Sequence, residues 1–336
     1  MLKINYSKSF DNNIYYTSIA NKKFDIKVCK KVNSKCIKKD GKIEYVIRDE
    51  LKDISLDKNK KTISTLELFD IYKSLKIGNF ESLFMSISLE DLIIGDFEKI
   101  QQIKKQIKSN GGIKENKYIK FLFNYTDLQP DVISLFFENH LDISTCYYCN
   151  IDFVNTYNTK SKKKNKFTLD HYYDKSTYPY LALSLYNFVP SCYTCNSKLK
   201  GIIEFTNLAP SSEKYDFEQK VKFKLFLDGM CQNLQIKSKK DIEIPLKENY
   251  SNDFKDYIEK LYLDERYRVH KDIVFEMIQN AELYPESRLK ELQNLTGIPF
   301  QQIKKDIFNL IDENDDLSKK PFSKLIKDIS EELGLV

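Results

Sequence analysis

The sequence predicts an α+β, mostly helical protein in which a small zinc-bound module is embedded between two larger regions. Two Cys-x-x-Cys pairs, Cys146/Cys149 and Cys192/Cys195, stand near the middle of the 336-residue chain. Short strand-like runs and then helical periods precede them, and helical periods dominate from Asp253 onward. These observations divide the chain into residues 1–143, 144–210 and 211–336.

The first region, residues 1–143, is expected to begin with short strands and to continue with helices. The runs FDIKVCKKV and GKIEYVIRDEL are strand-like, and the pattern becomes helical from Leu66. Because proline is favoured in the first turn of a helix, the run PDVISLFFENHL predicts a helix that begins at Pro130. Between these two points the segment 89–107 carries one apolar stripe, formed by Ile93, Phe97, Ile100, Ile103 and Ile107.

The last region, residues 211–336, is expected to be mainly helical. Its first run, KVKFKLFLDG, alternates like a strand that ends at a glycine. Apolar residues then recur at helical spacing to the end of the chain, and amphipathic helices normally bury such faces. The stripes therefore predict packing helices and not binding sites.

Composition and charge are those of a folded protein with modest attraction for polyanions. Hydrophobic residues make up 41% and charged residues 31% of the chain, and the net charge is +5. Lysine supplies most of the basic residues, and it binds phosphate as a point charge but reads base edges less well than arginine. A bound nucleic acid is therefore expected to be held by its backbone.

Nothing in the sequence indicates a membrane or secretory protein. No apolar run is long enough to cross a bilayer, and the start MLKINYSKSFDNNIYY lacks the apolar core of a signal peptide. A cytoplasmic location is therefore expected.

The four paired cysteines predict a structural zinc site. Zinc prefers four nitrogen or sulfur ligands in a tetrahedron, and each Cys-x-x-Cys turn presents two thiolates. Four thiolates leave no position for a catalytic water, so the ion would hold the fold together. Unrelated buried thiols remain an alternative, and a redox pair is disfavoured because no βαβ pattern surrounds either turn. Cys29, Cys36 and Cys231 lie outside the pairs and are expected to be ordinary thiols.

The segment between the cysteine pairs contains the candidate catalytic residues. Two strand-like runs, IDFVNTYN and KFTLDHYY, flank a lysine-rich turn that includes Lys163 and Lys164 and suggest a hairpin or a two-strand element. The second run contains Asp170 and His171, and YTCNSKLKG predicts a short helix that ends at Gly201. The lysine turn is either a solvated loop or a contact for a nucleic-acid backbone.

The order of these residues resembles the HNH endonuclease family, the ββα-metal or His-Me finger nucleases. The likeness rests on Asp170-His171, on Asn187 in YNFVPSC, and on Asn196 directly after Cys195. It is closest to the zinc-stapled branch, to which stand-alone HNH effectors of bacterial antiphage defence systems belong. It covers about residues 146–201 and is thin elsewhere.

The resemblance implies a role for each matching residue. His171 would be the general base that activates water, and Asn187 would brace the loop that orients it. Asp170 and Asn196 would bind one Mg²⁺ or Mn²⁺ ion, which would stabilise charge on the phosphate and on the leaving oxygen. Neutral imidazole can accept a proton near neutral pH. Further candidates for contact with substrate phosphates are Lys163, Lys164, Lys175, Lys198 and Lys200, with a solvated surface as the alternative.

The sequence departs from the family pattern in two places. Many members carry histidine where Asn196 stands, and relatives often have proline where this chain has Asp174, which is expected to be a surface residue with a metal ligand as the alternative. Neighbours on an ideal strand also face opposite sides. Asp170 and His171 can therefore serve one phosphate only if the strand ends or bulges there.

The expected function is metal-dependent hydrolysis of phosphodiester bonds in DNA. An RNA or tRNA nuclease with the same site is one alternative, and a catalytically silent, zinc-stabilised adaptor that binds nucleic acid is another. The two flanking regions are expected to form a helix-rich shell that docks a regulatory partner or occludes the site. An antiphage role, with an ATPase or sensor subunit as partner, is implied by the resemblance alone.

Overall fold

A computed structural model of the chain describes residues 1–6, 11–27, 45–47, 61–74, 80–109, 117–158, 163–205, 208–227, 236–312 and 314–336. Within these ranges the protein is α+β and mostly helical, with one three-stranded sheet and four two-stranded sheets. The expected fold class is confirmed at this level. Across the same ranges, no helix combines the length and the apolar character that a membrane crossing requires.

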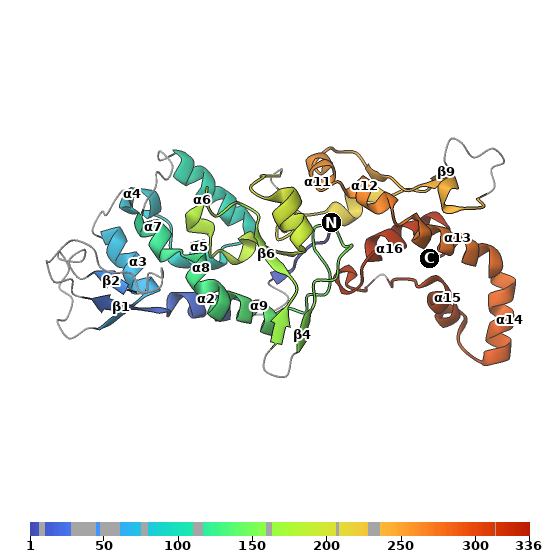
Figure 1. The fold of residues 1–336 in the computed structure, drawn as a ribbon, viewed down its shortest axis with the longest axis horizontal. Coiled ribbons are helices and arrows are strands. Elements are labelled where there is room, and N and C mark those ends of the chain that lie inside the picture. Colours follow the sequence, from blue (N-terminus) through green and yellow to red (C-terminus); the bar gives the residue numbers. More distant parts are fainter. Residues whose placement is uncertain are drawn as a thin grey trace.

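The described elements are arranged along one long axis (Figure 1). Elements of the first region lie at one end, β6 lies near the middle, and the helices of the last region lie at the other end. The N-terminus also lies in the middle, because the amino group of Met1 donates to the carbonyl oxygens of Tyr147 (2.8 Å) and Tyr148 (3.1 Å). The first residues therefore pack against the cysteine-bearing segment.

The first region contains one small sheet and a series of helices. Strand β1 (Lys23–Lys27) pairs with β2 (Tyr45–Ile47) in parallel and with β3 (Thr62–Ser64) in antiparallel orientation. Both strand-like runs predicted here thus contain a strand, and their remaining residues lie outside the described ranges. The helices are α2 (Asn12–Ala20), α3 (Thr65–Ser74), α4 (Phe80–Phe84), α5 (Leu89–Ile94), α6 (Phe97–Ser109), α7 (Lys117–Leu122) and α8 (Tyr125–Leu128).

The apolar stripe predicted over residues 89–107 is buried, but it is divided between two helices. Helix α5 ends at Gly95 and α6 begins at Phe97. A Cβ atom at position 95 would lie 2.2 Å from the carbonyl oxygen of Asp91, so only glycine fits this bend. Because the bend preserves the apolar face, all five stripe residues still reach the core: Ile93, Phe97, Ile100, Ile103 and Ile107.

The segment that begins at Pro130 is helical, but the helical stretch starts earlier than predicted, at Tyr125, because α8 runs directly into the next turn. It forms a π-helical turn, η3 (Gln129–Ile133), followed directly by α9 (Ser134–His140). Pro130 therefore lies inside a continuous helical stretch, at a π-helical turn, where a residue without a backbone N–H interrupts the regular hydrogen bonding.

The central segment pairs its strands differently from a simple hairpin of its two strand-like runs. Strand β4 (Thr156–Asn158) pairs with β5 (Lys163–Asn165), which lies in the lysine-rich stretch itself. The second run contributes β6 (Thr168–His171), which pairs with β7 (Phe188–Ser191), from farther along the chain. The first Cys-x-x-Cys turn meets this pair through the N–H of Tyr147, which donates to the carbonyl oxygen of Pro190 in β7 (3.2 Å).

The last region contains two strand pairs and then helices. Strand β8 (Val221–Phe223) pairs with β11 (Leu246–Glu248), and β9 (Phe226–Leu227) pairs with β10 (Ile242–Glu243). The predicted alternating run thus holds two short strands. The helices are α10 (Phe217–Lys220), α11 (Lys255–Lys260), α12 (Leu263–Arg268), α13 (Lys271–Leu283), α14 (Glu286–Thr296), α15 (Phe300–Phe308) and α16 (Ser323–Glu332).

The start of α16 is fastened to the first cysteine turn through Asn150. This residue is fully buried and has a positive φ of 54°, a backbone conformation that asparagine tolerates better than most residues. Its side-chain oxygen accepts from the N–H of Lys324 (3.1 Å) and from the hydroxyl of Ser323 (3.0 Å). The C-terminal helix therefore supports the segment that carries the predicted site.

Candidate zinc centre and adjoining histidine site

The four paired cysteines lie together in one buried cluster, as the sequence predicts. The sulfur atoms of Cys146, Cys149, Cys192 and Cys195 all lie within 4.8 Å of one another. A tetrahedral zinc ion with Zn–S distances of about 2.3 Å places its sulfurs about 3.8 Å apart. Four buried soft donors at this spacing fit a structural Zn²⁺ ion.

Each Cys-x-x-Cys turn is closed by its own backbone. In the first turn the N–H of Asn150 donates to the carbonyl oxygen of Cys146 (2.8 Å). In the second turn the N–H of Asn196 donates to the carbonyl oxygen of Cys192 (3.0 Å). The N–H of Cys195 also lies 3.4 Å from the sulfur of Cys192, where it can stabilise negative charge. Backbone hydrogen bonds therefore close both turns and hold the two thiols of each pair close together.

Arg266 of α12 contacts the cysteine cluster, and the sequence did not predict this contact. The Arg266 guanidinium donates to the sulfur of Cys195 (3.1 Å) and lies 3.4 Å from the carboxylate of Asp152. Burial disfavours its charge, but the sulfurs of Cys149 and Cys195 outweigh burial and raise the pKa of Arg266. Zn²⁺ with four thiolates carries two net negative charges, so an adjacent guanidinium is electrostatically favourable. The available signal was an arginine pair, DERYR, in a chain that otherwise relies on lysine.

The strand pair β6–β7 and the helix that follows place the predicted site directly beside the cluster. His171 is the last residue of β6 and lies opposite Phe188 of β7. Strand β7 leads into Cys192, and the π-helical segment η6 (Thr194–Lys200) ends at Gly201, whose φ is 52°. The strand thus ends at His171, which is one of the two arrangements that the predicted site needs, and the short helix ends where predicted.

The imidazole of His171 is held in one orientation. Its Nε2 lies 3.0 Å from the carbonyl oxygen of Ala182, and because a carbonyl only accepts, Nε2 carries the hydrogen. The rings of Tyr125 and Phe188 pack against it with centroids 4.5 and 5.0 Å away. Among the described residues no hydrogen bond is made to Nδ1, so this nitrogen can accept a proton.

Burial keeps the His171 ring neutral. The side chain is only 8% exposed, and this burial lowers the pKa of His171 to about 3, although the Ala182 carbonyl acts in the opposite direction. The imidazole is therefore uncharged at neutral pH, which is the form that a general base needs. Tyr125, which supplies one wall of this environment, comes from the first region and was not predicted.

Asn187 fixes the loop between β6 and β7. Its side-chain oxygen accepts from the N–H of Tyr173 (2.8 Å), and its amide nitrogen donates to the carbonyl oxygens of Tyr173 (3.0 Å) and Leu181 (3.1 Å). The side chain is fully buried. Because Ala182 follows Leu181 directly, Asn187 anchors the part of the loop that holds the His171 ring.

Asp170 and Asn196 make separate contacts. The Asp170 carboxylate is 3% exposed, accepts from the hydroxyl of Tyr148 (2.5 Å) and lies 3.0 Å from the ammonium of Lys200. Burial raises the pKa of Asp170, and Lys200 only partly offsets this. The Asn196 amide donates to the hydroxyl of Thr168 (2.9 Å).

The hydrogen bonds of the described residues include none between Asp170 and Asn196. A hard divalent cation needs several accessible oxygen ligands. A carboxylate already neutralised by an ammonium does not offer them, so this arrangement does not fit a Mg²⁺ or Mn²⁺ ion.

The predicted phosphate-binding lysines occupy different environments. Lys175 is exposed, with its ammonium 4.4 Å from the centre of the Tyr125 ring. Lys198 is also exposed, whereas Lys200 is buried against Asp170 and does not reach solvent. The backbones of Lys163 and Lys164 form part of β5, but their side chains lie outside the described residues.

Asp174 stands where relatives often have proline, and in this structure its side chain closes a turn. Its carboxylate accepts from the N–H groups of Ser176 (3.0 Å) and Thr177 (3.0 Å) and from both hydroxyls. These bonds explain why an aspartate stands here, because a short acceptor side chain stabilises such turns.

A cavity of about 230 Å³ opens beside Asn196. Tyr125 lines this cavity and also packs against the His171 ring, whereas His171 itself is not among the lining residues. Hydroxyl, amide and aromatic groups make its wall suitable for an uncharged polar group. Its lining consists of Tyr125, Gln129, Ser134, Phe167, Thr168, Leu169 and Asn196.

No family model, curated protein or solved structure matches the chain.

Proposed function

We propose that the chain is a metal-dependent endonuclease of the HNH, or ββα-metal, type that hydrolyses phosphodiester bonds, with DNA as its substrate. The observation that supports this most strongly is the setting of His171. A neutral imidazole ends a strand, is oriented by the Ala182 carbonyl oxygen 3.0 Å away, and lies on a scaffold that shares β7 and η6 with the four-cysteine cluster.

In this proposal His171 acts as the general base. Nδ1 accepts a proton from the water that attacks phosphorus, while Nε2 keeps its hydrogen on the carbonyl oxygen of Ala182. A base with a pKa of about 3 is weak. A bound phosphodiester would raise that pKa, because nearby negative charge favours imidazolium. Substrate binding would thus strengthen the base.

The divalent ion is a separate part of the proposal. In nucleases of this type Mg²⁺ or Mn²⁺ stabilises charge on the phosphate and on the leaving oxygen. Because Asp170 is paired with Lys200 and Asn196 with Thr168, we assign no step to such an ion at these residues. Metal dependence of cleavage is the measurement that decides this part.

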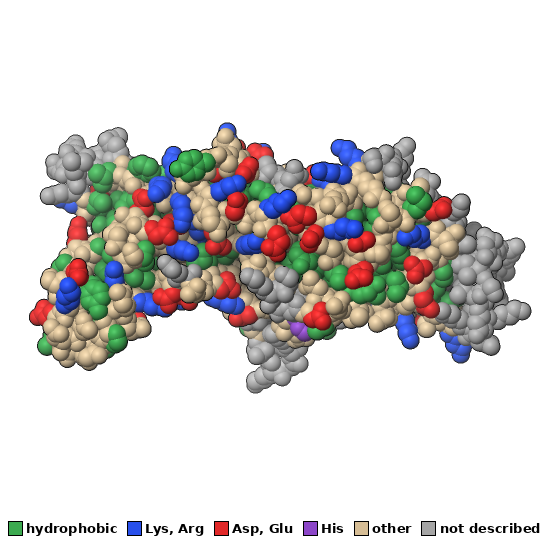
Figure 2. Space-filling model, turned by 180° about the vertical axis from the view of Figure 1, so that it is seen from behind, with side chains coloured by type: hydrophobic (Ala, Val, Ile, Leu, Met, Phe, Trp, Pro, Cys, Tyr) green, Lys and Arg blue, Asp and Glu red, His purple; other side chains and the backbone are tan. Residues whose placement is uncertain are grey.

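Nucleic-acid binding would depend on local contacts. Figure 2 shows basic and acidic side chains interspersed over one face of the molecule. Of the five lysines predicted to contact phosphate, Lys175 and Lys198 have described side chains that are exposed, and they are our candidates for contact with substrate phosphates. Such contacts do not distinguish DNA from RNA, so an RNA or tRNA nuclease remains the second candidate.

We further propose that a protein partner controls access to the site, in keeping with an antiphage effector that works with an ATPase or sensor subunit. The observation in favour is the 8% exposure of His171, which is low for a residue that must meet a nucleic acid. Loosening of the loop 172–187 would expose it. The defence role itself rests only on the resemblance.

The test is incubation of the purified chain, and of any complex that co-purifies with it from its native cells, with plasmid DNA, single-stranded DNA and total RNA. Each substrate is offered with Mg²⁺, with Mn²⁺ and without a divalent ion. We expect cutting of DNA in the metal arms and its loss in His171→Ala with zinc content unchanged. Cutting of RNA alone supports the second candidate. Binding without cutting in every arm supports a silent adaptor.

A further inference from the structure

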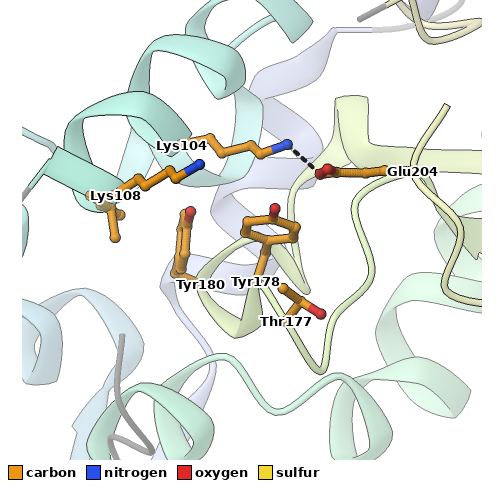
Figure 3. A pocket seen from close by; sticks show the side chains of 7 residues that line it. Lys104, Lys108, Thr177, Tyr178, Tyr180 and Glu204 are labelled. Atoms are coloured by element: carbon orange, nitrogen blue, oxygen red, sulfur yellow. Dashed lines mark hydrogen bonds and ion pairs between the residues drawn. The ribbon is translucent and has the colours of Figure 1, made fainter. Parts of the chain in front are cut away.

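A second cavity, of about 310 Å³, lies between α6 and the loop that follows β6 (Figure 3). It is separate from the four-cysteine cluster and from the contacts of His171. It is larger than the cavity beside Asn196, and its lining is charged. Among the described residues its wall consists of Lys104, Ile107, Lys108, Thr177, Tyr178, Tyr180 and Glu204.

Polar groups from both sides converge on this cavity. Lys104 and Lys108 are one turn apart on α6, and Figure 3 shows both side chains extending over the cavity. The hydroxyl ends of Tyr178 and Tyr180 point toward the same side in that view. Lys104 forms an ion pair with Glu204, and its ammonium lies 4.8 Å from the centre of the Tyr178 ring.

The cavity has one ammonium group more than it has carboxylates. Lys108 is exposed, and among the described residues no carboxylate pairs with it. Glu204 is committed to Lys104. Burial raises the pKa of Tyr178 to about 12, and its hydrogen bond with the carboxylate of Glu204 adds to this, so the phenol stays protonated and Glu204 is its partner. A positively charged cavity rich in donors suits a phosphate group.

We propose that this cavity binds the phosphate of a nucleotide, with Lys108 as its direct partner and with the hydroxyl of Tyr178 as a second partner once the phosphate displaces the carboxylate of Glu204. Its volume is within the range of small-molecule sites, so a sugar or base attached to the phosphate is also accommodated. The phosphate belongs either to a free mononucleotide or to one nucleotide of a nucleic-acid strand. Glu204 competes with the ligand for Lys104.

A ligand in this cavity would affect the orientation of the His171 ring. Tyr180 belongs to the single helical turn η4 (Pro179–Leu181), and the next two carbonyl oxygens, of Leu181 and Ala182, hold Asn187 and His171. A ligand that fixes Tyr180 therefore fixes the loop that orients the imidazole. This coupling rests on the proposed nuclease function, whereas the binding itself does not.

The test is titration calorimetry of the full chain without added divalent cation, so that no cleavage is needed for a signal. The probes are inorganic phosphate, dAMP and a ten-nucleotide single strand. We expect Lys108→Gln to weaken binding about tenfold, since it removes a charged partner of the phosphate. Glu204→Gln should tighten binding, because it removes the competing carboxylate.

Matched variants control for general charge effects. Lys105→Gln removes an exposed lysine of α6 that does not line the cavity, and Glu90→Gln removes an exposed carboxylate of α5. Neither should change binding. Binding of dAMP identifies a free nucleotide as ligand, and binding of the oligonucleotide alone identifies a strand. Absence of binding by all three probes, or equal weakening by Lys105→Gln and Lys108→Gln, overturns the proposal whether or not the chain cleaves DNA.

Discussion

The ammonium of Lys200 lies 3.0 Å from the carboxylate of Asp170, and both side chains are buried. Lys200 also donates to the backbone carbonyl oxygen of His171 (2.9 Å). This pair joins the end of η6 to the strand that carries the proposed base. Because a buried charge is costly unless it is paired, each residue needs the other.

Removal of Lys200 should therefore destabilise the protein strongly. Lys200→Met leaves the Asp170 carboxylate buried without its partner, which costs about 3–5 kcal/mol in the free energy of unfolding. Urea denaturation measures the change. The double variant Lys200→Met/Asp170→Asn removes both charges and should recover much of the loss, whereas additive losses in the double variant would show that the pair is not the cause.

Loss of one cysteine of the cluster should release zinc. Structural zinc sites contribute directly to folding, so Cys195→Ser should lose its metal and its cooperative unfolding transition. Elemental analysis should find one zinc ion per wild-type chain. Cys231→Ser, which changes a cysteine outside the pairs, is the matched control and should retain zinc. Equal zinc content in both variants would refute the assignment.

Arg266 should tune zinc affinity without being a ligand. Arg266→Met removes the guanidinium that contacts the sulfur of Cys195, and loss of such a supporting group typically lowers metal affinity by about 10- to 100-fold. Competition with a chromophoric chelator measures the change. Arg268→Met is a suitable control, because Arg268 is mostly exposed and its nearest carboxylate is that of Glu243, 3.8 Å away. The idea fails if both variants bind zinc as tightly as wild type.

The pH dependence of cleavage should reflect the buried histidine. His171 acts only when neutral, and in the free protein its pKa is about 3, so kcat/KM should persist as the pH falls below 6.5 and disappear only toward pH 3. The acid limb of kcat should lie at higher pH, because bound phosphate raises the pKa. Zinc retention is followed at each pH. A kcat/KM limb near an ordinary histidine value of about 6.5 would contradict this environment.

Local patterns predicted those features that depend on local chemistry. The cysteine turns, the stripe that is buried along α5 and α6, and the helix that ends at Gly201 all follow from spacing and backbone preference. The order of Asp170, His171, Asn187 and Asn196 also located the segment in which the imidazole is braced.

Contacts between distant segments could not be predicted in the same way. The Tyr125 ring reaches His171 from the first region, and Arg266 reaches the cluster from the last one. We expected Lys200 to contact phosphate. The sequence does not show that η6 turns this side chain inward, where it pairs with Asp170. The bend at Gly95 likewise depends on a backbone contact with Asp91 that periodicity does not encode.

The most direct test of the proposed function is the single-turnover rate of cleavage by His171→Ala on a defined DNA substrate, with zinc content measured on the same sample. Loss of a general base typically slows a reaction by about 100- to 10,000-fold, so we expect a drop of that size with zinc unchanged. His140→Ala, which removes an exposed imidazole at the end of α9, should cleave at the wild-type rate. Cleavage at the wild-type rate by His171→Ala would contradict the assignment of the base.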